Sequence, residues 1–222
     1  MLRQSVKHIY AQIRNKYLNF KLFGKKGLDT CPIWFSPDIR CRDLKKNTIE
    51  IHGEWAPNMI QLGRKGSPFV PIRMQTPFIS IRRGKLIFEG KCTIAEGFSI
   101  FIDGGDVVFG KNVYVNRNLM LQCEQGIDIG ENVLFGWNIC IRDTDGHALM
   151  LDGEKQTYRK SVKIGSDTWV AADCTILKGT EIASHCVVGC NSLVTGKKYT
   201  EQNCLIAGSP AGVIKHKIDW MN

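Results

Sequence analysis

The sequence lacks a long hydrophobic run, and it is short of acidic residues near its amino terminus. No segment of the 222 residues approaches the roughly 20 consecutive apolar residues of a membrane-spanning helix, so we expect none. The 30 Lys and Arg residues outnumber the 21 Asp and Glu residues, which gives a net charge of +9 and favours an anionic partner. No nucleic-acid-binding motif accompanies this charge, so we expect no nucleic-acid partner.

The cysteines and histidines do not form metal-binding patterns. None of the nine cysteines belongs to a C-x-x-C pair, and His8, His52, His185 and His216 are scattered along the chain, far from His147. An odd number of cysteines without a signal peptide predicts a reducing, cytoplasmic setting. We therefore predict no disulfide framework and no metal site.

Large apolar residues recur every six positions, and in the last run of six the residue two positions earlier is small in five cases. This spacing fits neither a 3.6-residue helix nor a two-residue strand alternation, but it fits a prism with three short strands per coil of about 18 residues. Each large residue then points to the axis, and neighbouring coils stack to bury it. The unbroken run is Ile164, Val170, Ile176, Ile182, Val188 and Val194, and the same frame fits Phe88, Ile94, Ile100, Phe109, Val115, Leu121, Ile129, Phe135 and Ile141.

These fifteen positions predict an all-β domain of about five coils over residues 79–207. Cys92, Cys174 and Cys186 take small inward positions and are expected to pack in the core. The corners should carry residues that tolerate the left-handed backbone conformation. The candidates are Gly110, Gly130, Gly165, Gly189, Asn112, Asn132 and Asp167.

The repeat breaks for a long stretch at residues 142–163, and a loop of this length in a compact fold is usually functional or disordered. It contains His147 beside two carboxylates, Asp143 and Asp145. An imidazole accepts a proton near neutral pH, and an acid can fix its tautomer, so His147 is a candidate general base. Spacing alone leaves open which aspartate orients the ring.

Residues 86–218 resemble the hexapeptide-repeat acetyltransferases, in particular the galactoside, maltose and polysaccharide O-acetyltransferase branch. Three stretches carry the resemblance: Gly110–Asn118, Ile129–Asn138 leading into Gly146-His147, and Ile164–Val170 through Gly208-Ser-Pro-Ala211. The resemblance implies a left-handed parallel β-helix with an extruded loop. It also implies a homotrimer whose sites form between subunits, with acetyl-CoA as the co-substrate.

The resemblance places the catalytic histidine of the family at His147, which follows a glycine as in the family. It places the acceptor-site asparagine at Asn116, with Asn118 as the second candidate. Asp143 and Asp145 have no fixed counterpart in the family, and either remains a candidate for orienting the histidine. Transfer would proceed by proton removal from the acceptor hydroxyl, direct attack on the thioester and stabilisation of the oxyanion by backbone N–H groups.

The same resemblance implies the contacts to CoA, with some departures from the family pattern. Ala171-Ala172 stands where the family has Gly-Gly or Gly-Ser, and Gly189-Cys190-Asn191-Ser192 replaces Gly-Ala-Gly-Ser. The lysine that usually follows Val-Thr is displaced to Lys197 or Lys198. The full predicted set is Trp169, Ala171, Ala172, Cys190, Asn191, Lys197, Lys198, Pro210 and Lys215.

The activity expected from this resemblance is O-acetylation of a sugar hydroxyl in cell-surface polysaccharide or lipopolysaccharide biosynthesis. One alternative keeps the acetyl donor but uses an amino acid, amino-sugar or antibiotic acceptor. Another is a β-helical scaffold without catalysis, against which the intact Gly146-His147 and Asn116 argue.

The amino-terminal third does not follow the six-residue period. Residues 1–28 contain seven Lys or Arg and no acid, with apolar residues at helical spacing, which predicts a basic amphipathic helix. It would attach the enzyme to an anionic membrane at the inner face, suiting a lipid-linked saccharide acceptor, or dock on its own trimer. Residues 29–78 hold most of the prolines and are expected to form a cap region, and residues 208–222 a short tail. The apolar positions of the helix are Val6, Ile9, Tyr10, Ile13, Tyr17 and Leu18.

Overall fold

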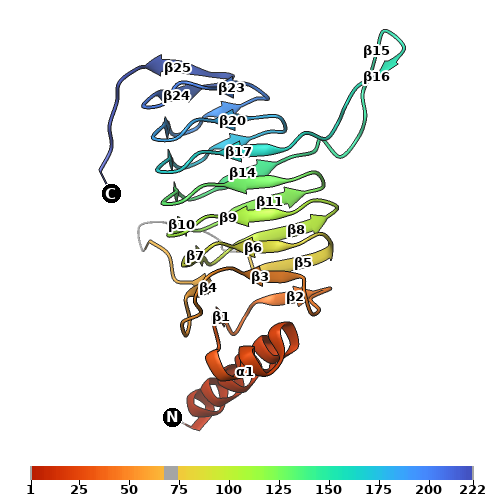
Figure 1. Ribbon diagram of the computed structural model, residues 1–222, viewed down its shortest axis with the longest axis vertical. Coiled ribbons are helices and arrows are strands. Elements are labelled where there is room, and N and C mark those ends of the chain that lie inside the picture. Colours follow the sequence, from red (N-terminus) through yellow and green to blue (C-terminus); the bar gives the residue numbers. More distant parts are fainter. Residues whose placement is uncertain (1, 68–74, 222) are drawn as a thin grey trace.

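The computed structural model describes residues 2–67 and 75–221, with side chains of the first helix described from residue 9 onward. It is a left-handed parallel β-helix with one α-helix, α1 (Leu2–Thr30), lying across its amino-terminal end (Figure 1). The helix bends at Gly24, whose φ of 66° lies outside the helical region. The side chain of Val6 lies outside the described residues. No helix among those residues is long and apolar enough to cross a membrane.

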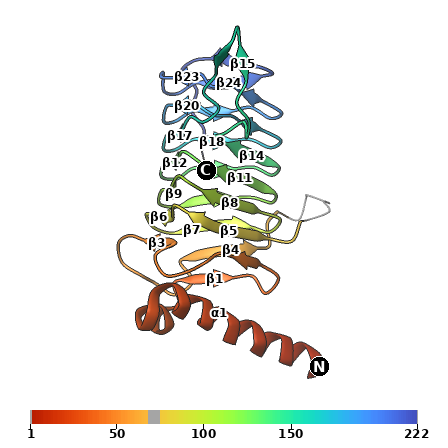
Figure 2. The same cartoon turned by 90° about the vertical axis from the view of Figure 1, so that its right-hand side faces the viewer.

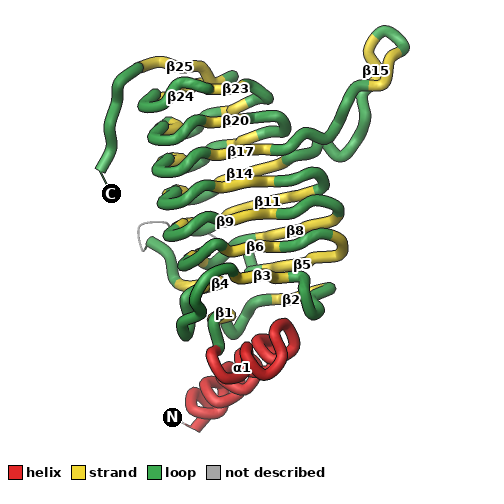
Figure 3. Tube along the Cα trace, in the orientation of Figure 1, coloured by secondary structure: helices red, strands yellow, loops and turns green. Residues whose placement is uncertain are grey.

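Most of the strands form three sheets that make the flat faces of the prism, with loops at its corners (Figure 3), and the pairing within each sheet is parallel except at the last strand of one sheet. Sheet A contains β1 (Ile33–Phe35), β4 (Ile60–Arg64), β7 (Cys92–Ala95), β10 (Val113–Val115), β13 (Leu134–Phe135), β18 (Trp169–Val170), β21 (Val187–Val188), β24 (Leu205–Gly208) and β25 (Ala211–Lys215). Sheet B contains β2 (Arg40–Arg42), β5 (Phe78–Arg83), β8 (Ser99–Asp103), β11 (Leu119–Cys123), β14 (Ile139–Arg142), β19 (Thr175–Ile176) and β22 (Leu193–Val194). Sheet C contains β3 (Ile49–Ile51), β6 (Leu86–Phe88), β9 (Val107–Phe109), β12 (Ile127–Ile129), β17 (Val162–Ile164), β20 (Glu181–Ile182) and β23 (Lys198–Tyr199).

The prism has more coils than the sequence predicts. The described strands complete seven coils, one strand from each sheet per coil, starting at β1. Residues 29–78 are therefore not a separate cap: β1 to β4 stack in register with the later coils, as Ile33 opposite Ile60 shows. The expected count of five coils and the domain boundary at residue 79 are both wrong for this reason.

The six-residue repeat lines the core as predicted. All fifteen large apolar positions are at most 4% exposed, and the small residues two positions earlier are buried with them. Cys92, Cys174 and Cys186 pack there, and burial raises the pKa of each thiol. These cysteines are therefore core residues rather than reactive thiols.

Two kinds of corner residue have different roles. Asn112, Asn132 and Asp167 have φ of 55–58°, so the left-handed conformation is confirmed for them. The glycines that precede them do not have it. A Cβ on Gly110 would lie 2.4 Å from the backbone of Gly130 in the next coil. These glycines are needed because the coils stack closely, and the prediction of left-handed backbone is wrong for them.

The carboxyl end closes the prism. β25 folds back antiparallel on β24, after the cis Ser209–Pro210 bond, and the Tyr199 hydroxyl donates a hydrogen bond of 3.0 Å to the carbonyl of Ala211 in β25. The last residues then run down beside sheet A (Figure 1). Trp220 donates from Nε1 to the Asp167 carbonyl at 2.8 Å.

Candidate active site

The long interruption of the repeat is an ordered arm. Residues 142–163 leave the prism between β14 and β17 and end in a two-stranded hairpin, β15 (Met150–Leu151) with β16 (Glu154–Lys155), which projects away from the coils (Figures 1 and 2). The two sides of its base are joined by backbone hydrogen bonds, from Asp145 N to Tyr158 O and from Lys160 N to Asp143 O, both 2.9 Å. The arm therefore holds its residues in a defined place outside the prism.

His147 lies on this arm and is exposed. It follows Gly146, whose φ of 81° turns the chain and whose N–H donates to Thr144 Oγ1 at 3.0 Å. The described residues offer its imidazole no hydrogen bond or ion pair. Its ring nitrogens are therefore available to an external group.

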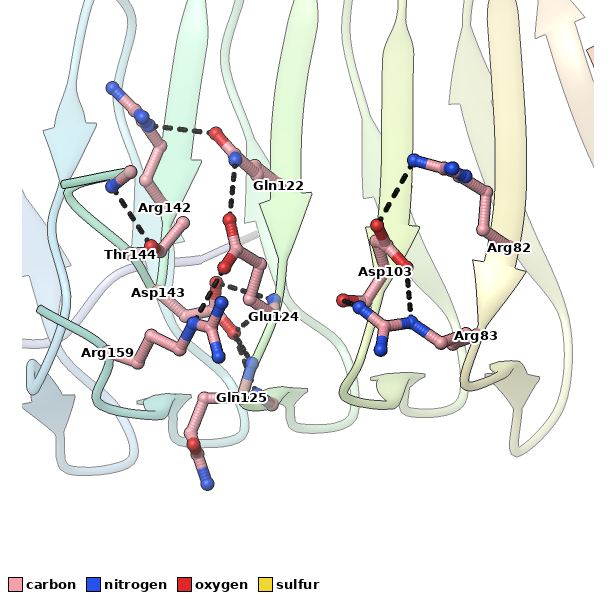
Figure 4. Close-up of polar contacts among 12 residues, drawn as sticks. Arg82, Arg83, Asp103, Gln122, Glu124, Gln125, Arg142, Asp143, Thr144 and Arg159 are labelled. Atoms are coloured by element: carbon pink, nitrogen blue, oxygen red, sulfur yellow. Dashed lines mark hydrogen bonds and ion pairs between the residues drawn. The ribbon is translucent and has the colours of Figure 1, made fainter.

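Asp143 accepts hydrogen bonds from the backbone of a neighbouring coil. It is fully buried, and its carboxylate accepts hydrogen bonds from the backbone N–H groups of Glu124, Gln125 and Gly126 at 2.6–3.0 Å (Figure 4). These groups belong to the turn one coil below the arm. The carboxylate fixes this turn against the base of the arm, and the structure does not bring it to His147.

Asp145 is held by a lysine from the coil above. Lys178 Nζ lies 3.0 Å from Asp145 Oδ2 and also donates to the Thr157 carbonyl at 2.7 Å. A single cation thus bonds to both sides of the arm. Neither aspartate contacts His147 within the described chain, so the orientation of the ring by an aspartate stays a prediction.

A chain of polar side chains that the sequence did not reveal supports the arm from below. Arg142 donates to Gln122 at 3.1 Å, Gln122 to Glu124 at 3.2 Å, and Arg159 pairs with Glu124 at 2.7 Å (Figure 4). Gln122 and Arg142 are register partners in adjacent strands. The missed signal is the coil period, which places residues about 20 apart in contact.

Most of the predicted acceptor and CoA residues gather at another corner, between sheets A and B. Asn116 lies there in the fourth coil, and its Oδ1 accepts from the N–H groups of Ser67 and Arg117 at 3.1 and 2.9 Å. Asn118 joins a hydrogen-bonded ladder with Asn138, at 2.9 Å. The residues predicted to contact CoA at this corner, in the coils above, are Ala171, Ala172, Cys190 and Asn191.

The two alanines at this corner differ in one respect that matters for chemistry. The N–H of Ala171 donates to the Val188 carbonyl at 2.9 Å and is therefore engaged in the sheet. The N–H of Ala172 has no acceptor among the described residues. Only the second alanine offers a backbone donor for a developing oxyanion.

The remaining predicted residues lie in four other places. Trp169 is on sheet A, 37% exposed, with its ring centroid 6.1 Å from that of Trp220. Pro210 and Lys215 lie at the two ends of β25 and Lys197 lies at the corner that bears the arm. Lys198 is on sheet C and pairs with Glu181 at 2.8 Å, lowering the pKa of that carboxyl, so the structure does not bring it to the other CoA candidates.

Comparisons with known proteins show similarity to hexapeptide-repeat transferases. A family model described as bacterial transferase hexapeptide (six repeats) matches residues 161–196. The chain is 30% identical to the galactoside O-acetyltransferase of Escherichia coli K12, over 60% of this chain and 68% of that protein. It is 35% identical to the galactoside O-acetyltransferase of Lactococcus lactis, over 58% of this chain, and spans 61% of the length of that relative.

Two further likenesses extend over more of the chain. An uncharacterised 24.8 kDa protein in the cps region of Klebsiella pneumoniae is 32% identical over 93% of this chain and 87% of its own length. The crystal structure of the polySia-specific acetyltransferase NeuO superposes with a TM-score of 0.50 at 23% identity, covering 83% of this chain and 78% of that chain. The structural likeness shows the fold.

Proposed function

The chain belongs to the hexapeptide-repeat acetyltransferase family, and from this premise we propose that it transfers an acetyl group from acetyl-CoA to a sugar hydroxyl, with His147 as general base. The observation that carries the proposal is the exposed imidazole of His147 on an ordered arm, without a polar partner in the described chain. The related galactoside O-acetyltransferases support a saccharide acceptor, and we propose that this saccharide belongs to a cell-surface polysaccharide.

The residues at the corner between sheets A and B fit a CoA thioester. Small residues, Gly136, Ala171 and Gly189, occupy one register position there in consecutive coils, and the N–H of the adjacent Ala172 has no acceptor among the described residues. Lys197 and Lys215 are exposed and have no ion pair in the described chain, which leaves both available for phosphates. Bound acetyl-CoA supplies an electrophilic thioester carbonyl.

Three residues of the chain have separate roles in the reaction. A ring nitrogen of His147 accepts the proton of the acceptor hydroxyl, which makes that oxygen nucleophilic. The Ala172 N–H donates to the oxyanion that develops on the attacked carbonyl. Asn116 positions the acceptor near the same corner. As the new ester C–O bond is completed, the thioester C–S bond breaks, and CoA leaves as a thiol with the proton that His147 accepted. Because the attack is direct, no residue needs to carry the acetyl group.

We place this site between two subunits of a homotrimer. His147 projects on the arm from the corner between sheets B and C, whereas the Ala172 corner borders sheet A. The arm carries Leu149, Met150 and Leu151 at 61–66% exposure, an apolar tip that suits a protein partner. A C₃ trimer of parallel prisms would let each arm reach the corner of a neighbour and complete its site.

The test compares His147→Ala with a matched control, His52→Ala. His52 is an exposed histidine on the first coil that pairs only with glutamates, at 3.1 Å from Glu89 and 3.6 Å from Glu50. Release of the CoA thiol from acetyl-CoA is measured in the presence of each candidate acceptor: sugars, lipid-linked saccharides, amino acids, amino-sugars and antibiotics. We expect sugar-dependent release that falls about 10²–10⁴-fold in His147→Ala and is unchanged in the control.

Three outcomes would contradict the proposal. Retained activity in His147→Ala would remove the histidine from the mechanism. Release only with amino acid, amino-sugar or antibiotic acceptors would show that the acceptor is one of these classes and not a sugar. CoA binding without release across the whole panel would favour the scaffold alternative.

A further inference from the structure

Helix α1 has an inner face that is fully occupied by the prism. Leu18 and Leu22 are buried against the first coil. Asn19 exchanges hydrogen bonds with both the N–H and the carbonyl of Ile33, at 3.1 and 2.8 Å, and Asn15 accepts from the N–H of Phe35 at 2.9 Å. The docking that the sequence left open is thus present, through one side of the helix only.

The opposite face of α1 is apolar and uncovered. At about 100° per residue, its large side chains fall within an arc of roughly 100° centred opposite the docked face. Each of them is more than half exposed, which is unusual for five neighbouring large apolar residues. They are Ile9 (55%), Tyr10 (65%), Ile13 (63%), Tyr17 (59%) and Phe20 (51%). We call this set the apolar stripe.

Basic residues border the apolar stripe on both sides. Lys16 precedes one edge of the arc and Lys21 follows the other, by the same helical geometry. Both are exposed and have no ion pair in the described chain. Residues 1–28 contain seven Lys or Arg and no acid, so no negative charge in this segment offsets them. The charged side chains that flank the stripe on the helix are therefore cationic.

We propose that α1 attaches the protein to an anionic membrane surface, with the apolar stripe in the interface and the lysines on lipid headgroups. An apolar stripe with tyrosines, flanked by lysines, is the composition of helices that lie in the plane of a bilayer. Cationic side chains near an anionic leaflet each contribute about 1 kcal/mol. The source of the negative charge is thus the lipid, rather than a soluble phosphate, which would leave the stripe in water.

The position of α1 favours a membrane over a second copy of the chain. The helix lies across the end of the prism (Figures 1 and 2), so the face opposite its docked side points away from the coils. In the homotrimer of parallel prisms, on which this step rests, three stripes would face in one direction instead of facing each other. Three weak contacts on one surface bind far more tightly than one.

The test is co-sedimentation of the full-length protein with vesicles of phosphatidylcholine alone or with about one third phosphatidylglycerol. The stripe variant is Ile13→Ser with Tyr17→Ser, and the charge variant is Lys16→Glu with Lys21→Glu. The matched controls alter exposed residues elsewhere: Met221→Ser, 95% exposed at the carboxyl end, and Lys91→Glu with Lys111→Glu on the third and fourth coils.

We expect wild type and controls to bind the anionic vesicles only, and both α1 variants to bind at least tenfold more weakly. Acetyl transfer to a soluble sugar should be the same in all variants, which separates this test from that of His147. Unchanged binding of the stripe variant would overturn the proposal. Equal binding of wild type to neutral and anionic vesicles would also overturn the proposal. A stripe variant that keeps its vesicle binding but has a lower molar mass in solution would overturn it too, because the stripe would then be a contact between subunits.

Discussion

Replacing Asp143 by alanine should test whether this carboxylate supports the turn below the arm rather than the catalytic histidine. The change removes the acceptor of three backbone N–H groups, those of Glu124, Gln125 and Gly126. A buried donor left without a partner costs about 1–3 kcal/mol, and water can reach part of this turn, so we expect a loss of about 3–5 kcal/mol in the free energy of unfolding. That corresponds to a fall of about 10 °C in Tm.

The assay is urea unfolding followed by circular dichroism, with Asp145→Ala as the matched control. Asp145 is part of an exposed ion pair with Lys178, so its loss should cost less than about 1 kcal/mol. Asp143→Asn should fall between wild type and Asp143→Ala, because the amide keeps one acceptor oxygen. Equal midpoints for Asp143→Ala and wild type would refute the reasoning. A folded Asp143→Asn protein that loses activity as completely as His147→Ala would return the aspartate to the site.

Two further predictions concern the corners. Gly130→Ala places a Cβ 2.5 Å from the backbone N of Ser166, so the coils must separate. We expect the free energy of unfolding, measured in urea, to fall by about 2–4 kcal/mol. Gly153→Ala, at the open tip of the arm, is the control, and its φ of 82° should lower the free energy of unfolding by only about 1 kcal/mol. A larger loss at the tip would contradict close stacking. Asn138→Ala forfeits two ladder hydrogen bonds and strains a φ of 56°, so its Tm should fall below that of Asn138→Gly, which keeps the conformation; identical Tm values would exclude the strain.

The repeat could be predicted from sequence because its corners are equal in length. From Phe88 onward most connections keep the inward residues six apart, so the period is visible. In the first two coils the inward residues, such as Ile33 and Ile60, are just as buried. The connections there vary, with 13 residues between Arg64 and Phe78. Unequal corners hide the period without changing the stacking, which is why the number of coils was underestimated.

The site residues also divide into those that local sequence features predict and those that depend on contacts between coils. The glycine before His147 and the break in the repeat are local features, and they located the histidine on the arm. The role of Asp143 depends on N–H groups 17–19 residues earlier, one coil away, which no local pattern reveals. The expectation for the corner glycines fails for the same reason. Their constraint comes from the backbone of the next coil rather than from their own φ.

The side-chain amides of Asn15 and Asn19 prevent the amino-terminal end of the prism from pairing with other molecules. A stack of parallel strands ends in a row of open backbone donors and acceptors, which can template further strands from other molecules. On β1 the groups of Ile33 and Phe35 that face away from the stack are already bonded to these two asparagines. The helix therefore prevents further strands from adding to this end of the β-helix. A molecule that lost it would expose this edge, and because β25 closes the opposite end, end-to-end pairing of two such edges is the failure expected of a truncated protein.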